Sequence, residues 1–170
     1  MRRTIELLNE MIDSGVIESY AIFGAVAQMR YTEAVMTMDV DVLVILPDSN
    51  PFVILTPIYD FCKKKGYFPE GEAVKIEEWP VQFIPAFDDL SEAAMRDALE
   101  DDFEGIPVRV VAPDYLAVMA LKLGRTKDKL RIEALLNAQA TTIVEIEKLA
   151  TKFNLIAKWQ NFTEKYLNES

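Results

Sequence analysis

The hydrophobic pattern of the first two-thirds of the chain changes repeatedly between a helical period and the apolar runs that are typical of strands. Helices are predicted at about 4–14, 25–29, 52–65 and 91–102, and strands at about 19–23, 38–46, 73–77, 81–84 and 108–111. The strongest strand signal, at 38–46, ends in five consecutive apolar residues. Helices and strands that follow one another in this way indicate an α/β or α+β fold.

After Pro113 the helical period continues, and it predicts a helical C-terminal part. The residues expected to begin its four helices are Asp114, Thr126, Thr141 and Ile156. No repeat or glycine–serine linker interrupts the sequence, and 51% of its residues are hydrophobic, which is enough for one core. We therefore expect a single domain over 1–170, with the sheet in 1–112 and helices alone in 113–170.

The composition excludes several kinds of chemistry. The chain contains no histidine, so histidine-activated nucleophiles and imidazole metal sites are ruled out. Its single cysteine, Cys62, can form no internal disulfide and fits the apolar stripe of a helix, so we expect a buried core residue. Any catalysis must therefore use carboxylates, lysine, tyrosine, hydroxyls or backbone amides.

Charge is unevenly distributed along a chain whose net charge is −10. Residues 88–104 carry eight acidic side chains and one basic side chain, which is typical of a solvated helix surface. Residues 122–131 carry five basic side chains and one acidic side chain, and these form either a solvated surface or a ligand site. The net charge argues against non-specific DNA binding. Because no apolar run could span a membrane and no signal peptide is recognisable, we expect a cytoplasmic protein.

The sharpest chemical feature is the pair Asp39 and Asp41 at the start of the strongest predicted strand. Side chains at positions i and i+2 of a strand point to the same face, so the two carboxylates repel each other unless a cation lies between them. Two carboxylates with open positions for water and phosphate oxygens suit Mg²⁺. Because paired aspartates are also common at strand edges, the context has to support this interpretation.

Gly24 supplies part of that context, because it closes one predicted strand and opens a short helix. Backbone amides at such a turn can approach a phosphate closely, although a glycine can also serve the turn alone. Together, the glycine turn and the aspartate strand predict a phosphate cradle beside a metal site.

Three segments resemble the nucleotidyltransferase-like proteins of the DNA polymerase beta superfamily: YAIFGAVA at 20–27, TMDVDVLV at 37–44 and DYLAVMALKLGRTKD at 114–128. The resemblance covers 19–136 and is closest to small prokaryotic members grouped with abortive-infection toxins. It implies a small mixed sheet packed with helices. It also implies transfer of a nucleotidyl group from a nucleoside triphosphate to a hydroxyl of a protein, RNA or small molecule, with Mg²⁺, or Mn²⁺ in its place.

The site residues that this resemblance implies are Gly24 and Ala25 at the triphosphate, Asp39 and Asp41 at the metal, Gln82 at a third catalytic position, and Lys122, Arg125 and Asp128 at the phosphates. Lys122 and Arg125 are three residues apart, so we expect them on one helix face, where they either bind phosphate or form a solvated helix end. We expect Asp128 to form an exposed salt bridge with one of them.

Two positions depart from the family pattern. Ala25 replaces a glycine or serine, which removes a hydroxyl contact to phosphate. Gln82 occupies the position of a third carboxylate, and a neutral amide can offer its oxygen to a metal but cannot accept a proton. Glu77 or Glu78 are the nearby substitutes. Two further hypotheses therefore stay open: a catalytically silent binding or regulatory module with a protein partner, and a structural protein whose aspartates pair with lysine or arginine.

Overall fold

The computed structural model describes residues 1–47 and 55–167. The chain divides into two compact units. Unit 1 comprises Met1–Ala27 and Val35–Val111, and unit 2 comprises Gln28–Ala34 and the chain from Ala112 onward.

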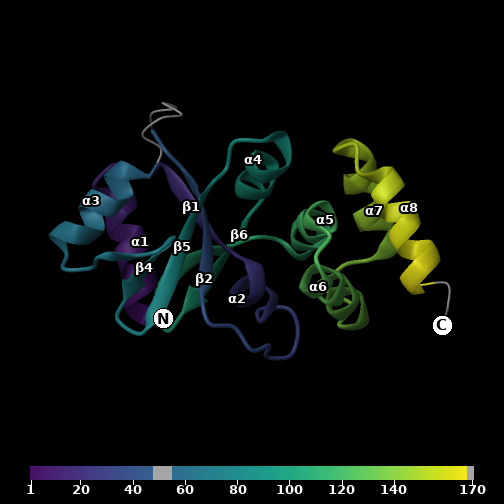
Figure 1. The fold of residues 1–170 in the computed structure, drawn as a ribbon, viewed down its shortest axis with the longest axis horizontal. Coiled ribbons are helices and arrows are strands. Elements are labelled where there is room, and N and C mark those ends of the chain that lie inside the picture. The colour runs from purple at the N-terminus through teal and green to yellow at the C-terminus, as the bar shows by residue number, and fades with distance from the viewer. Residues whose placement is uncertain (48–54, 168–170) are drawn as a thin grey trace. The chain divides into compact units, whose positions relative to one another are not determined.

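The described part of unit 1 contains a seven-stranded sheet with the order β3-β4-β5-β2-β1-β7-β6 (Figure 1). The strands are β1 (Ser19–Phe23), β2 (Val40–Ile45), β3 (Pro69–Glu70), β4 (Ala73–Ile76), β5 (Trp79–Pro85), β6 (Leu99–Phe103) and β7 (Ile106–Val110). Strand β2 runs antiparallel to β1 and parallel to β5, and β1 runs parallel to β7. The mixed sheet confirms the predicted fold class.

The central position of β2 explains its sequence. Four of its residues, Val40, Val42, Leu43 and Val44, are at most 1% exposed. A strand that is covered on both faces has no need for alternating polar residues, so it becomes a continuous apolar run. The predicted strand at 38–46 is therefore confirmed in its core, but it begins two residues later than expected, which leaves Asp39 just outside it.

Four helices of the described chain accompany the sheet: α1 (Arg2–Asp13), α2 (Gly24–Gln28), α3 (Thr56–Lys64) and α4 (Asp89–Arg96). Figure 1 shows α1 and α3 on one side of the strands and α4 on the other. The first turn predicted for α3, at 52–54, lies outside the described residues. Both faces of the sheet are thus covered, as the apolar strands require.

The acidic run is not a single helix. The helix predicted at 91–102 ends at Arg96, and Leu99–Phe103 instead forms the edge strand β6. Its start was also misplaced, since Asp88 caps α4 by accepting a hydrogen bond of 2.8 Å from the Ser91 backbone amide. Charged side chains on an edge strand discourage pairing with other chains, so the acidic residues fit this position as well as they fit a helix.

Unit 2 consists mainly of α5 (Pro113–Leu123), α6 (Thr126–Asn137), α7 (Ile143–Lys152), α8 (Ile156–Phe162) and a π-helical turn, η1 (Thr163–Leu167). The four predicted helices are confirmed. Their expected caps are shifted by one or two residues, because the N-cap positions are Ala112, Arg125, Thr142 and Leu155. Most of α5 is buried, so this helix forms the centre of the unit.

Cys62 is fully buried on α3, which confirms the prediction of a core residue. Burial raises the pKa of its thiol to about 11. Because the thiolate is the reactive form, we expect the folded protein to react with iodoacetamide at pH 8 about 100-fold more slowly than the protein unfolded in guanidinium chloride. Mass spectrometry of the alkylated protein measures both rates, and equal rates would show that the thiol is accessible.

In residues 1–47 and 55–167, no helix combines the length and the apolar character needed to cross a bilayer.

Candidate functional site

Gly24 and Asp41 meet where β1 ends beside β2. Phe23, the last residue of β1, pairs with Asp41 across the antiparallel ladder. Gly24 follows with a φ of +65°, and a Cβ atom added to it would lie 2.2 Å from Oδ2 of Asp41. Only glycine is compatible with both the backbone angle and this contact. The glycine turn predicted from sequence therefore accommodates the Asp41 carboxylate.

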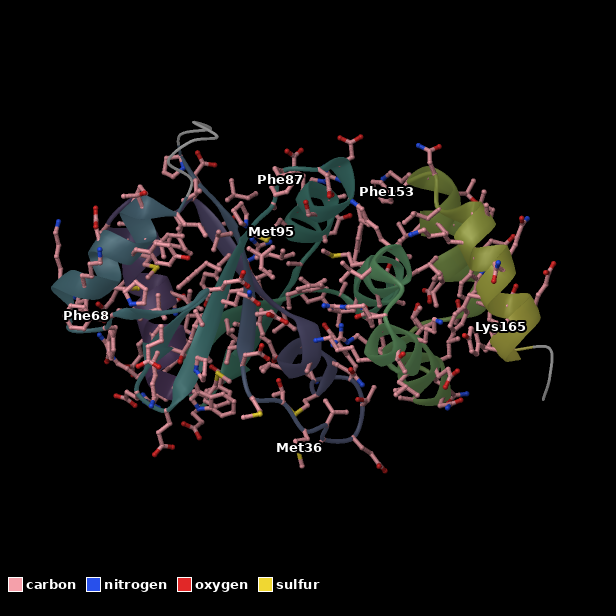
Figure 2. All side chains as sticks on the ribbon, in the orientation of Figure 1. Met36, Phe68, Phe87, Met95, Phe153 and Lys165 are labelled. Carbon is pink, nitrogen blue, oxygen red and sulfur yellow. The ribbon has the colours of Figure 1, made fainter. Side chains whose placement is uncertain are left out.

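Asp39 lies in the exposed segment that leads into β2. The hydroxyl of Thr37 donates hydrogen bonds to Oδ1 of Asp39, at 3.2 Å, and to its backbone oxygen, at 3.0 Å. Thr37 thus orients the carboxylate, a role that the sequence pattern did not indicate. Met36, in the same segment, is 99% exposed and extends away from the ribbon (Figure 2).

Gln82 lies beside Asp41, because the two residues are partners in the parallel pairing of β2 with β5. Its amide Nε2 donates a hydrogen bond of 3.2 Å to Oε2 of Glu72. Glu77 and Glu78 form the far end of the β4–β5 hairpin, beyond the pair Ile76 and Trp79, so neither is the carboxylate that reaches Gln82. Nothing in the sequence pattern indicated Glu72, because the short strand β3 that precedes its turn was not predicted.

The predicted donors to a divalent cation in unit 1 are the side-chain oxygen atoms of Asp39, Asp41 and Gln82. In the part of the chain that the structure describes, no three acidic or cysteine side chains gather as a metal cluster. Two carboxylates and an amide oxygen are nevertheless hard ligands of the kind that Mg²⁺ and Mn²⁺ prefer. The donor set therefore fits a cation that also binds water and a phosphate. Ala25 follows Gly24 in the first turn of α2, is half-buried, and offers only its backbone polar groups.

The predicted phosphate residues belong to unit 2. Lys122 and Arg125 do not share a helix, because Gly124 ends α5 with a φ of +70° and Arg125 is the N-cap of α6. Asp128 does pair with Arg125, with 2.7 Å between Oδ2 and Nε, but its carboxylate is fully buried rather than exposed. The expectation of an exposed salt bridge was therefore wrong.

Asp128 is the centre of a network that sequence reasoning only partly found. Besides the Arg125 side chain it accepts the Arg125 backbone N–H at 3.1 Å, and it lies 3.5 Å from Nη1 of Arg131. Arg131 is 7% exposed and donates from Nε to Oε1 of Gln28 at 3.1 Å. The spacing of Arg131, three residues after Asp128 on one helix, was the available signal for this second partner. The network holds Arg125, whose side chain is half-exposed, at the start of α6.

A cleft of about 370 Å³ opens in unit 2 between α5, α6, α8 and η1. Its lining includes Lys129, Lys158 and Lys165, together with the rings of Phe162 and Tyr166. Lys129 donates to the Tyr166 hydroxyl at 3.0 Å and lowers the pKa of that phenol. Figure 2 shows Lys165 on the last helical turn. The cleft adds cationic groups to a unit that already carries Lys122 and Arg125.

The predicted site residues thus fall into two groups. Gly24, Ala25, Asp39, Asp41 and Gln82 lie in unit 1. Gly24 contacts Asp41, Asp41 pairs with Gln82 across β2 and β5, and Asp39 directly precedes β2. Lys122, Arg125 and Asp128 lie in unit 2, where a buried carboxylate positions the arginine.

Neither a family model nor a curated protein matches the sequence. Several solved structures are similar to the chain, including these three. A nucleotidyltransferase-like protein from Paracoccidioides brasiliensis has a TM-score of 0.63 at 12% identity, over 97% of this chain and 88% of that one. The antibiotic-resistance factor ANT(2'')-Ia in solution has a TM-score of 0.57 at 14% identity, over 98% and 97%. The crystal structure of ANT(2'')-Ia with adenylyl-2''-tobramycin has a TM-score of 0.54 at 13% identity, over 96% and 97%.

The similarity extends over nearly the whole of this chain and most of each neighbour, so it is not limited to one motif. The chain therefore has the fold of the nucleotidyltransferases.

Proposed function

We propose that the protein is a nucleotidyltransferase that binds a nucleoside triphosphate with Mg²⁺, or Mn²⁺, and transfers a nucleotidyl group to a hydroxyl acceptor. The observation that carries this proposal is the contact between Gly24 and Asp41, where the absent Cβ leaves room for a carboxylate at the strand end. A purely structural turn would need a glycine because of the positive φ. It would not need an acidic side chain 2.2 Å from the position that a Cβ atom of residue 24 would occupy.

Each residue has a chemical part in this proposal. Asp39, Asp41 and the Gln82 oxygen would hold the cation, which neutralises triphosphate charge and polarises the α-phosphate when it is bound. The backbone at Gly24 and Ala25 can approach the phosphates closely because no large side chain stands there. Within unit 2, Lys122 and Arg125 would bind phosphate, as the resemblance implies, and the buried Asp128 orients the arginine fork.

The acceptor that we favour is a small, cationic, hydroxyl-bearing molecule. One neighbour was solved with adenylyl-2''-tobramycin, a nucleotide joined to an antibiotic. The net charge of −10 attracts cationic small molecules and disfavours RNA, whose phosphates repel an acidic surface. A protein acceptor is the other class that this charge allows. A cytoplasmic location and the grouping with prokaryotic abortive-infection toxins remain part of the proposal, because they follow from the sequence pattern.

The substitution Asp41→Asn tests the proposal. We expect the wild-type protein to bind ATP, CTP, GTP or UTP in the presence of MgCl₂ and to transfer the labelled nucleotide to tobramycin or to a protein substrate. Removing one of two metal-binding carboxylates is expected to lower the transfer rate at least about 100-fold. Calorimetry measures binding, and chromatography of the labelled product measures transfer.

The matched control is Asp60→Asn, which removes an exposed aspartate of α3 that pairs only weakly with Lys63 at 3.8 Å. This variant is expected to keep full activity. Transfer at the wild-type rate by the Asp41→Asn variant would exclude the proposed metal site, and absence of triphosphate binding by the wild type would exclude the proposed function.

A catalytically silent binding module is the second candidate, and the neutral amide of Gln82 beside Asp41 is the observation that favours it. Such a module would bind the triphosphate, lose that binding on Asp41→Asn substitution, and transfer nothing to any acceptor. The same pair of measurements therefore separates the two functions.

A further inference from the structure

The amide of Gln82 leaves the proposed reaction without a proton acceptor at the third position of the site. A hydroxyl that attacks phosphorus must lose its proton, and carboxylates are the usual acceptors in a protein without histidine. Asp39 and Asp41 would be engaged by the cation. A further carboxylate close to Asp41 is therefore what the chemistry lacks.

Glu72 lies where such a carboxylate is needed. Asp41 and Gln82 are direct partners on neighbouring parallel strands, so their side chains project from the same face of the sheet, with backbones ~4.8 Å apart. Oε2 of Glu72 accepts a hydrogen bond of 3.2 Å from Nε2 of Gln82. Gln82 therefore links the two acidic residues: it is the strand partner of Asp41 and the hydrogen-bond partner of Glu72.

The turn that carries Glu72 is fixed by the sheet. Glu70 and Ala73 pair across β3 and β4, so only Gly71 and Glu72 lie between them, and Gly71 has the positive φ of +65° that this short connection needs. The pairing of Val74 with Val81 then places the start of β4 next to Gln82. Glu72 is therefore held on a two-residue turn with little freedom to move away.

Glutamine at position 82 suits this arrangement better than a carboxylate would. An acid at both positions would bring two negative charges into contact, whereas the amide N–H₂ binds Glu72 and leaves the amide oxygen as a ligand for a cation. The family pattern places the third carboxylate on the strand. In this chain the carboxylate beside that position is Glu72, on the turn between β3 and β4.

We propose that Glu72 is the general base of the nucleotidyl transfer, an inference that rests on the proposed function. The acceptor O–H gives its proton to the Glu72 carboxylate while the oxygen forms a bond to the α-phosphorus. The bond between the α-phosphorus and the oxygen that bridges to the β-phosphorus breaks, and pyrophosphate leaves with that electron pair. Glu72 then returns its proton to water.

The test compares Glu72→Gln, Gln82→Glu and the double variant Glu72→Gln/Gln82→Glu with the wild type. Initial rates of pyrophosphate release are measured with Mg²⁺, each nucleoside triphosphate, and tobramycin or a protein substrate as the acceptor. We expect Glu72→Gln to lower the rate about 100-fold, as loss of a general base does, and to leave the affinity for the triphosphate within about twofold. Because the Glu72 side chain is exposed, the Glu72→Gln variant should have the melting temperature of the wild type.

The double variant restores a carboxylate, now on the strand, and is expected to recover at least about tenfold of the lost rate. A merely structural role of Glu72 would not be rescued in this way. The control is Glu78→Gln, at an exposed glutamate of the turn between β4 and β5, which should keep the wild-type rate.

The outcomes separate this inference from the proposed function. A rate that is lost in Asp41→Asn but kept in Glu72→Gln would overturn the role of Glu72 alone. Loss in Glu72→Gln without any recovery in the double variant would also overturn it. A wild-type protein that binds the triphosphate but releases no pyrophosphate with any acceptor would overturn both, because a base has no part in a silent module.

Discussion

Replacing Asp128 by alanine is expected to lower the free energy of unfolding of unit 2 by about 3 kcal/mol, because it leaves a buried arginine without its carboxylate. The Asp128 side chain is fully buried and Arg131 is 7% exposed, so water cannot replace the lost interactions at either position. The variant also loses the hydrogen bond to the Arg125 backbone N–H at the start of α6. A loss of this size lowers the melting temperature by about 10 °C in a protein of this length.

The two tryptophans allow this effect to be measured by unit. Trp159 is buried in unit 2, and Trp79 lies in unit 1, so urea unfolding followed by fluorescence in a Trp79→Phe background reports on unit 2. Lys127→Ala, an exposed residue of the same helix, is the control and should change stability by less than about 0.5 kcal/mol. The double variant Asp128→Leu/Arg131→Met should regain most of the loss, since it removes both charges. A loss below about 1 kcal/mol in Asp128→Ala would show that the pair behaves as an exposed one.

The proposed phosphate site includes the same network. Arg125 is half-exposed and is the N-cap of α6, where its fork is held by Asp128 through two side-chain hydrogen bonds of 2.7 and 3.2 Å. An arginine that is fixed before binding loses less conformational entropy when it meets a phosphate. The buried aspartate therefore serves the proposed phosphate site as well as the stability of unit 2.

The strands and helices that were predicted correctly are those whose burial produces a recognisable hydrophobic pattern in the sequence, either a helical period or a continuous apolar run. Strand β2 is covered on both faces and is apolar from Val42 to Ile45, while the C-terminal helices each bury one stripe. The helix predicted over the acidic run was wrong because charged residues are common both on a helix surface and on an edge strand. Only the two-residue turn at Glu104 and Gly105, which both have a positive φ, distinguishes the two structures. A glutamate in that turn is too unusual a residue for the pattern to have been recognised.

The candidate site was predictable where a motif is local and not where it depends on pairing. Gly24 and Asp41 are seventeen positions apart, yet the β1–β2 register brings them into contact, and the sequence indicated each of them separately. Glu72 could not be found, because its position follows from β3, a strand of two residues that carries no periodic signal. The burial of Asp128 was missed for a similar reason, since its partner Arg131 is held in turn by Gln28, which lies 103 positions from that arginine.

Substituting Gly24 by alanine is expected to lower nucleotidyl transfer at least about 100-fold. The new Cβ would lie 2.2 Å from Oδ2 of Asp41, so the carboxylate has to rotate away from the position at which it is proposed to hold the cation. A displacement of about 1 Å in a reacting site can cost a factor of ~100 in rate. The positive φ of +65° adds a backbone cost of about 1–2 kcal/mol, because an alanine at that angle is strained.

Gly15→Ala separates these two effects. Gly15 has a similar φ of +71°, but a Cβ added there meets nothing within 4 Å. Both variants should lose a similar amount of stability from backbone strain in urea unfolding, whereas only Gly24→Ala should lose transfer and the calorimetric binding of the triphosphate with Mg²⁺. The double variant Gly24→Ala/Asp41→Asn should be no less active than Asp41→Asn alone, since both changes disable the same carboxylate. If Gly24→Ala kept wild-type binding and transfer, the space at Gly24 would serve the turn only, and the proposed function would lose the observation on which it rests.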